Sequence, residues 1–425
     1  MFSTLANAWK IPELRKKLMF TVLVLLIYRV CSVIPVPFID AAQLATYFES
    51  TLSNTILGLY DAMSGSAFST ATVLALGIQP YINASIIIQL LTVAIPPLER
   101  MAKEEGEAGK KKIERITRYT TVGLGLLLGF AYYTMMRNYE SSGLTLITGE
   151  GFLPALVIIL AFTAGSSFVM WLGEQITEFG IGNGISMILF ANIISGLPGG
   201  LSRILGMAWW QALIVVIGMA ALVVFIVFIN DAERRIPISY AKRVVGRKVY
   251  GGQSTNLPIK VAMSGVMPVI FASSICSIPA TICAFVPGWQ DSWANTYLFA
   301  HNSWPYFAAY VLMIFFFSWF YSTIQYDPVE ISNNLKKNGG FIPGFRPGKP
   351  TSDFIQKVIN KIIVFGAIYL SIVAGLPIIA GNLMTSVQNL AIGGTSVIIV
   401  VGVALETVKA LEAQMLMRHY KGFLD

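Results

Sequence analysis

Side chains capable of acid–base or nucleophilic chemistry are scarce in the apolar parts of this chain. The two histidines, His301 and His419, fall in a predicted outer loop and in the C-terminal tail. Neither can therefore act as the general base of a serine nucleophile within a membrane. Glu406 and Lys409 are three residues apart on a predicted helix, where they can pair with each other. We expect no enzyme activity and no cofactor.

Metal and nucleotide motifs are equally weak. Cys31, Cys276 and Cys283 lie in or near apolar runs without CxxC or Cys/His spacing, as small packing residues do. The GIGNG stretch at 180–184 lacks the preceding strand of a dinucleotide site, which favours a flexible loop at a membrane edge. We expect no metal site. Intramembrane carboxylates or histidines, usual in ion-coupled carriers, are nearly missing too.

Membrane-spanning helices are the elements that must position any functional group. The 425 residues are 55% hydrophobic and 12% charged, with a mean hydropathy of +0.67. A soluble domain carries roughly a quarter charged residues. At about 20 apolar residues per spanning helix, we predict an all-α polytopic membrane protein with ten spans. They lie near 18–37, 73–95, 119–137, 153–172, 185–198, 209–229, 261–286, 305–325, 358–380 and 393–411.

Basic residues define the orientation of these spans, because cytoplasmic loops carry an excess of Lys and Arg. Of the 30 Lys and Arg residues, only Arg29, Arg137 and Arg203 fall outside the segments expected inside. Those segments are 1–17, 100–118, 234–260, 336–361 and 409–421. Both termini are therefore predicted to be cytoplasmic.

Ten spans divide into two groups of five, residues 1–205 and 206–425. An odd-numbered group enters and leaves the membrane on opposite sides, so repeated halves would be inverted. The second and seventh spans are both interrupted by Gly or Pro, at Gly77, Pro80, Gly265, Pro268 and Pro279. Interrupted helices at corresponding places in inverted halves indicate a functional site between them.

A stretch rich in small residues precedes the second span. Between Ala62 and Thr72, Met63 and Phe68 are the only large apolar residues, so this stretch would be a poor lipid-facing surface. Broken backbone at membrane depth requires protein or a water-filled cavity beside it. We predict a short half-helix, a glycine break, a full span and an adjacent cavity.

The first long inner loop, 231–260, predicts a structure of its own. Ile236, Ile238 and Tyr240 alternate with other residues, and a turn near Val245 would return the chain, which predicts a basic β-hairpin over 234–252. Basic protrusions suit an acidic protein or the phosphates of ribosomal RNA.

The second long inner loop, 326–357, predicts a short helix. Asp327 and Pro328 form a cap and first turn, and the helix would end after Lys337. The following segment, 341–348, is predicted to be an irregular exposed tip.

Two apolar pairs have helical spacing. Ile78 and Ile82 are four residues apart, as are Ile185 and Leu189, so each pair lies on one helix face. Such pairs are usually packing residues, but Ile78 stands next to the predicted cavity.

Seven stretches in order along the chain closely resemble the SecY family, whose members are pore subunits of the bacterial protein-conducting channel. The stretches are ALGIQPYINASIIIQLLT (75–92), GEAGKKKI (106–113), MWLGEQITEFGIGNGIS (170–186), YAKRVVGRKVYGGQSTNLPIKV (240–261), GVMPVIFASSI (265–275), NLKKNGGFIPGFRPG (334–348) and GGTSVIIVV (393–401).

The resemblance implies an hourglass pore between two inverted five-helix halves, closed by a re-entrant plug half-helix within 61–72. By motif position, the implied pore ring is Ile78, Ile82, Ile185, Leu189, Ile270 and Ile399. The implied plug comprises Asp61, Ala62, Met63, Ser64, Gly65, Ser66, Ala67, Phe68, Ser69 and Thr70. The implied lateral gate carries Asn83, Ser85, Gln89, Ser273 and Ser274. The loop positions that engage a motor or ribosome are Arg247, Lys248 and Arg346.

The resemblance further implies a passive, gated channel in the bacterial plasma membrane for unfolded secretory polypeptides, with lateral release of membrane segments into lipid. Implied partners are SecE, SecG, the SecA motor, the ribosome, signal sequences, nascent polypeptides and the lipid bilayer. The alternative is a secondary transporter with broken helices and inverted repeats, which would require a polar site at mid-depth. An intramembrane enzyme is a third, weaker alternative.

Overall fold

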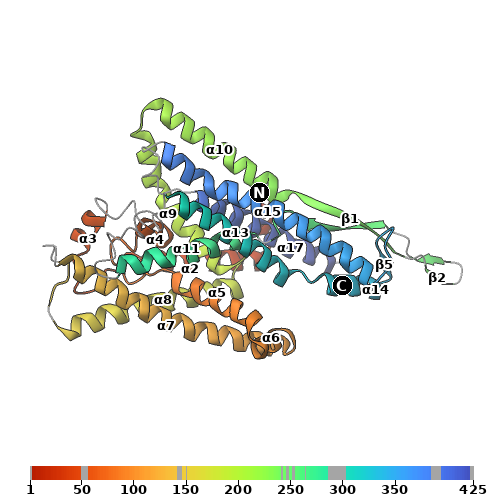
Figure 1. Cartoon of the computed structure of the whole chain (residues 1–425), viewed down its shortest axis with the longest axis horizontal. Helices are drawn as coiled ribbons and strands as arrows, with labels where there is room; N and C mark the ends of the chain where they lie inside the picture. The colour runs from red at the N-terminus through yellow and green to blue at the C-terminus, as the bar shows by residue number, and fades with distance from the viewer. Residues whose placement is uncertain are drawn as a thin grey trace.

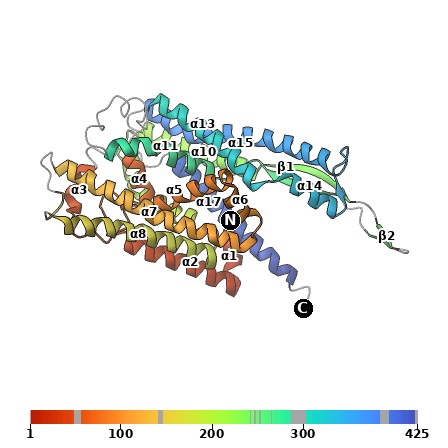
Figure 2. The same cartoon turned by 60° about the horizontal axis from the view of Figure 1, so that its bottom comes forward.

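The computed structural model of the chain describes residues 2–48, 56–140, 146–149, 151–240, 243–245, 248–250, 254–263, 265–285, 303–383 and 394–421. Helices form an elongated bundle, and a β-structure projects from one end of it (Figures 1 and 2). The short helices α3 and α4 lie towards the other end in both views.

The named elements in the described part of the first half are all helices, joined by turns and loops. Proline in the first turn starts α2 and α6, since its fixed φ suits that position. The helices are α1 (Phe2–Lys10), α2 (Pro12–Cys31), α3 (Ala41–Tyr47), α4 (Ile56–Ser64), α5 (Gln79–Ala94), α6 (Pro96–Lys103), α7 (Gly106–Glu140), α8 (Phe152–Phe179) and α9 (Gly184–Leu205).

The second half combines helices with strands. Its helices are α10 (Trp209–Asp231), α11 (Met267–Phe285), α13 (Trp304–Gln325), α14 (Pro328–Lys337), α15 (Lys349–Leu383) and α17 (Gly394–Lys421). Its strands are β1 (Glu233–Tyr240), β2 (Arg243–Val245), β3 (Lys248–Tyr250), β4 (Ser254–Lys260) and β5 (Gly340–Phe341).

Each predicted span overlaps a helix, although only some of these helices are long and apolar enough to count as membrane spans. Five described helical stretches are long and apolar enough to cross a membrane, and α5 with α6, bent by 105°, makes up to six. The five are Phe152–Phe179, Gly184–Ser202, Trp209–Asp231, Trp304–Lys337 and Lys349–Leu376. The spans predicted on α2, α7, α11 and α17 lie outside these six, so the count of ten stays a prediction.

The predicted hairpin is confirmed and is longer than expected. Strands β1 and β4 pair antiparallel from Glu233 opposite Lys260 to Ser239 opposite Ser254, and β2 pairs with β3 further out. The second loop adds β5 to the free edge of β1. The prediction that 341–348 is entirely irregular was therefore wrong at Phe341, because the edge of β1 offers unpaired backbone groups.

The predicted cytosolic helix is confirmed as α14. The Asp327 carboxylate caps it by accepting hydrogen bonds from the backbone N–H of Val329, at 2.8 Å, and of Glu330, at 3.3 Å. The helix ends at Asn338 as expected, and Gly339 follows with φ +72°.

The predicted half-helix lies earlier in the chain than expected. Helix α4 covers Ile56–Ser64, and turns rather than helix follow as far as Ile78. Gly65 and Ser66 have φ of +68° and +67°, a left-handed backbone that ends a right-handed helix. The second span accordingly begins its helix at Gln79 rather than at residue 73.

The GIGNG segment is a loop over 180–183, as predicted, and its last residue, Gly184, starts α9 in close packing against α8. The Asn183 side chain accepts a 3.0 Å hydrogen bond from the backbone N–H of Ile185, in the manner of an N-cap. A Cβ at Gly184 would lie 1.8 Å from the carbonyl oxygen of Gly173. Helices α8 and α9 therefore meet backbone to backbone at this point.

Candidate functional site

The six predicted pore residues lie in one hydrophobic cluster. Five of them are at most 4% exposed, and Ile185 packs against the cluster as a partly buried residue. They come from four elements in both halves of the chain: Ile78 and Ile82 from α5 and the turn before it, Ile185 and Leu189 from α9, Ile270 from α11, and Ile399 from α17. Apolar side chains from both halves therefore meet in the interior, and their arrangement as a ring stays a prediction.

Helix α4 ends against polar side chains from two other helices. The side-chain N–H of Asn192, on α9, donates a 2.7 Å hydrogen bond to the carbonyl oxygen of Met63. The Arg29 guanidinium, on α2, donates a 3.2 Å hydrogen bond to the carbonyl oxygen of Gly65. Arg29, within the first predicted span, is therefore bound to the backbone just after α4.

The turns after α4 are tied internally. The Asp61 carboxylate accepts a 2.8 Å hydrogen bond from the backbone N–H of Ser69, and the Ser64 hydroxyl accepts one of 3.0 Å from that of Phe68. Burial raises the pKa of Asp61, and the Ser69 hydrogen bond partly opposes this rise. The predicted plug residues thus form a compact segment. We call residues 56–72, which comprise α4 and the turns that follow it, the plug segment.

The end of the plug segment is hydrogen-bonded, backbone to backbone, to the chain that follows α2. The backbone N–H of Val36 donates to the carbonyl of Ala71 at 3.2 Å, and that of Val73 donates to Ile34 at 2.9 Å. Phe68 is 2% exposed and packs in a second hydrophobic cluster with residues of α7 and α8. The plug segment is therefore seated by apolar packing as well as by hydrogen bonds.

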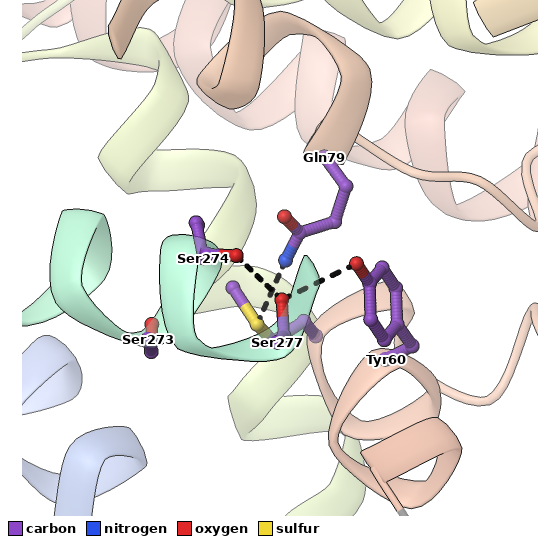
Figure 3. Close-up of a pocket in the computed structure, with 6 residues that line it drawn as sticks. Tyr60, Gln79, Ser273, Ser274 and Ser277 are labelled. Atoms are coloured by element: carbon purple, nitrogen blue, oxygen red, sulfur yellow. Dashed lines mark hydrogen bonds between the residues drawn. The ribbon is translucent and has the colours of Figure 1, made fainter. Parts of the chain in front are cut away.

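A small polar pocket lies where the plug segment meets α5 and α11 (Figure 3). It leaves no room for a water molecule, and its lining is Tyr60, Met63, Gln79, Ser273, Ser274 and Ser277. The Gln79 amide donates to the sulfur of Met63 at 2.9 Å, and the hydroxyls of Tyr60 and Ser277 are 3.4 Å apart. Gln79 Oε1 and Ser274 Oγ have no hydrogen-bond partner among the described residues.

The structure brings together only part of the predicted lateral gate. Ser273 and Ser274 meet Gln79 in the pocket, whereas Gln89 donates a 3.2 Å hydrogen bond to Ser85 on its own helix. Asn83 is half-buried on α5 and does not line this pocket.

Some residues of this region were missed from the sequence. Gln79 stands in the same polar series of the second span as Asn83, and that pattern could have indicated it. Tyr60, Ser277 and Asn192 gave no sequence signal, because tertiary packing alone brings them to the plug segment.

The positions predicted to engage a motor or ribosome are placed unequally. Arg346 is exposed in the loop between β5 and α15, and its carbonyl oxygen accepts a 2.8 Å hydrogen bond from the Thr351 hydroxyl. Arg247 and His301 lie outside the described residues. Lys248 and His419 are described only by their backbone, in β3 and α17.

The expected pair of Glu406 and Lys409 was wrong. The Lys409 ammonium lies 2.7 Å from the carboxylate of Asp231 and donates to the carbonyl oxygen of Asn230 at 3.3 Å. It therefore links α17 to the end of α10. Among the described residues, no group of three or more His, Cys, Asp or Glu side chains could hold a metal ion.

Comparison with known proteins decides the family. The family model of SecY matches residues 72–408. The chain belongs to the SecY family. The SecY protein translocase subunits of Streptomyces galbus and Corynebacterium glutamicum are 42% and 40% identical to it, and the alignments cover 100% and 99% of this chain and 100% of both relatives. That of Mycobacterium tuberculosis is 39% identical, with full coverage of both chains.

Solved structures agree on the fold of this SecY family member. A protein-conducting channel matches with a TM-score of 0.69 at 19% identity, covering 94% of this chain and 92% of the other. A SecY structure, whose plug domain is described as stabilising the closed state and maintaining a membrane seal, matches at 0.66 and 18% identity with the same coverage. Canine Sec61 in a ribosome–channel complex matches at 0.63 and 17% identity, again covering 94% and 92%.

Proposed function

We propose that this SecY family member is a passive, gated channel that conducts unfolded secretory polypeptides across the membrane and releases membrane segments sideways into lipid. Full-length relatives at about 40% identity are protein translocase subunits. The structural observation that carries the proposal is that all six apolar side chains, from both halves of the chain, belong to one hydrophobic cluster, which also includes Met63 of the plug segment. Family membership also identifies the chain as a channel subunit rather than an enzyme.

The apolar convergence suits a sliding polypeptide. Branched aliphatic side chains offer no fixed hydrogen-bond partners, so a passing chain would not be held at any one position. A narrow apolar constriction also loses water, which opposes the passage of ions. We propose that Ile78, Ile82, Ile185, Leu189, Ile270 and Ile399 form this constriction and that the plug segment closes it on the outer side.

The work of translocation must come from a partner, because a passive pore couples to no energy source. We propose that SecA or the ribosome engages the basic hairpin around Arg247 and Lys248 and the loop around Arg346. The hairpin and α14 project together from one end of the bundle (Figure 1), and Arg346 is exposed there. The ribosome-bound canine Sec61 and yeast Ssh1 complexes, related in fold, support such docking.

The wider architecture follows the same proposal. Ten spans would form inverted halves, 1–205 and 206–425, as an hourglass in the bacterial plasma membrane with both termini cytoplasmic. SecE and SecG would be the membrane partners. The location of nearly all Lys and Arg residues in the predicted inner segments supports this orientation.

We propose the contact of α5 with α11 as the lateral gate. The polar pocket at this contact contains buried oxygens of Gln79 and Ser274 that lack hydrogen-bond partners among the described residues. The contact between the two helices therefore leaves two buried hydrogen-bond acceptors unsatisfied. A sufficiently apolar signal sequence would replace the contact between α5 and α11 by inserting between these helices, where it would also contact lipid. The transporter alternative is not favoured, because the full-length relatives are protein translocase subunits.

The test is reconstitution of the purified chain with its membrane partners in lipid vesicles. We expect ATP-dependent uptake of a secretory polypeptide only when SecA is added, and no uptake of small solutes against a gradient. Concentrative uptake of a small solute without SecA would instead establish a transporter.

A further inference from the structure

We infer that Arg29 and Asn192 form a latch that holds the plug segment (56–72) closed by binding the carbonyl oxygens at the end of α4. This inference rests on the proposed channel function, in which the plug segment must leave its seat before a polypeptide can pass. We call the two side chains the plug latch.

The latch acts on groups that a helix leaves unsatisfied. The last carbonyls of a helix have no partner within it. Among the described residues, the backbone at the end of α4 closes one return bond of its own, from the N–H of Ser66 to the carbonyl of Asp61, at 3.0 Å. The carbonyls of Met63 and Gly65 instead accept from Asn192, at 2.7 Å, and Arg29, at 3.2 Å. The end of α4 is thereby bound to both α9 and α2.

The plug backbone at Gly65 is packed tightly against polar side chains. A Cβ at Gly65 would lie 3.0 Å from Ser195 Oγ and 3.1 Å from both Arg29 Nη1 and Asn192 Oδ1. Gly65 also has φ +68°, which disfavours other residues. Three polar groups therefore surround the position that a side chain would occupy at Gly65, so the site favours glycine.

The two hydrogen bonds differ in strength. Asn192 is 1% exposed, so losing its bond would leave the Met63 carbonyl buried without this donor. Arg29 is exposed apart from its contact with Gly65, so its bond contributes less. Its positive charge also suits the negative end of the α4 dipole.

A polar latch can hold the plug segment without trapping it. When the plug segment leaves its seat, water enters the opened channel and can hydrate the guanidinium, the amide and the freed carbonyls. The hydrogen bonds of the latch are therefore exchanged for hydrogen bonds to water rather than lost. The latch would therefore set how often the resting channel opens.

The experiment measures ion conductance of the complete complex in planar bilayers, without a motor, ribosome or substrate. Asn192→Leu keeps a similar volume but removes the donor, and we expect the resting conductance to rise about tenfold. Arg29→Met should raise it about twofold to threefold. Arg29→Lys retains a cationic donor and should seal nearly as well as the parent protein. Such rescue would not follow from a merely structural role.

A chain that lacks residues 56–70 separates the latch from the proposed function. In that background, Asn192→Leu and Arg29→Met should add no further leak, because the latch has nothing left to hold. If the deleted chain itself conducts no ions, the channel and plug assignment fails rather than the latch. If the deleted chain leaks while both substitutions in the intact chain seal normally, the latch is refuted.

Gly65→Ala gives an independent answer if a latch substitution prevents assembly. The added methyl group would push against all three polar groups from the plug side, and we expect it to raise the resting conductance as Asn192→Leu does. A tight seal in an assembled Gly65→Ala complex would contradict the inference.

Discussion

The hydroxyl of Tyr132 donates a 2.6 Å hydrogen bond to the carbonyl oxygen of Phe68, and the rings of the two residues stack with centroids 4.4 Å apart. One residue of α7 thus holds both the backbone and the side chain of the plug segment. Tyr132 in turn packs on Phe162 of α8, with centroids 5.0 Å apart. The seat of the plug segment is therefore part of the bundle core.

Tyr132→Phe should weaken this seat while it preserves the ring stack. The buried Phe68 carbonyl would lose its donor, which costs about 1–3 kcal/mol. We expect a disulfide between engineered cysteines on the plug segment and α7 to form more slowly. Tyr119→Phe on the same helix is the control, because Tyr119 is 72% exposed. Equal rates in both variants would remove Tyr132 from the seat.

Polar substitutions at the constriction should break the seal. Ile82→Asn and Ile399→Asn would let water wet the proposed constriction. This should raise the ion leak and allow substrates with weak signal sequences to pass. Bilayer conductance and translocation of a substrate with a defective signal sequence measure the two effects. Ile87→Asn, at a 39% exposed position of α5, should change neither. Normal conductance and normal rejection of the defective signal sequence in both variants would refute the assignment of Ile82 and Ile399 to the constriction.

Apolar substitutions in the polar pocket should make the gate harder to open. Ser274→Ala removes a buried oxygen that lacks a partner among the described residues, so the closed contact should gain about 1 kcal/mol. Gln79→Leu removes another such oxygen but also the hydrogen bond to the sulfur of Met63, so its gain should be smaller. Translocation of substrates with weakly apolar signal sequences should fall, whereas strongly apolar ones should still pass. Ser202→Ala, at an exposed position of α9 outside the proposed gate, is the control. A uniform effect on all substrates would contradict a role in gating.

Charge reversal in the Arg346 loop, proposed to be cytosolic, should uncouple the channel from the partner that drives translocation. Arg346→Glu should reduce SecA- or ribosome-driven translocation several-fold and leave membrane insertion of the protein intact, because an exposed basic contact is electrostatic. Lys336→Glu, exposed on α14, makes the same charge change away from the tip. Normal translocation by Arg346→Glu would leave the loop with a topological role only.

Close packing of α8 on α9 predicts a sharp contrast between two glycines. Gly184→Ala would place a methyl group 1.8 Å from the carbonyl oxygen of Gly173, and separating the helices should cost about 1–3 kcal/mol or more. Gly123→Ala meets no atom within 4 Å and should be neutral or slightly stabilising, since alanine favours helix. Thermal unfolding in detergent should show a lower Tm only for Gly184→Ala. Equal Tm values would contradict the packing.

Sequence patterns predicted the elements of this fold better than their contacts. The cap at Asp327 and the alternation from Ile236 to Tyr240 depend on neighbouring residues, so α14 and the hairpin were predictable. Helix α4 was misplaced because left-handed backbone at Ser66 gives no sequence signal. Asn192 was missed because it meets Met63 only through the packing of α9 on the plug segment. The pair of Lys409 with Asp231 likewise joins distant parts of the chain.

The most direct test places a cysteine in the proposed path of the polypeptide. After replacement of Cys31, Cys276 and Cys283 by alanine, Ile82→Cys and Ile87→Cys are compared in complexes that hold a secretory polypeptide stalled in mid-passage. The stalled chain carries one cysteine at the depth of the constriction. We expect a disulfide at position 82 and none at position 87. Efficient translocation with no disulfide at position 82, or with equal disulfides at both positions, would contradict a channel lined by these isoleucines.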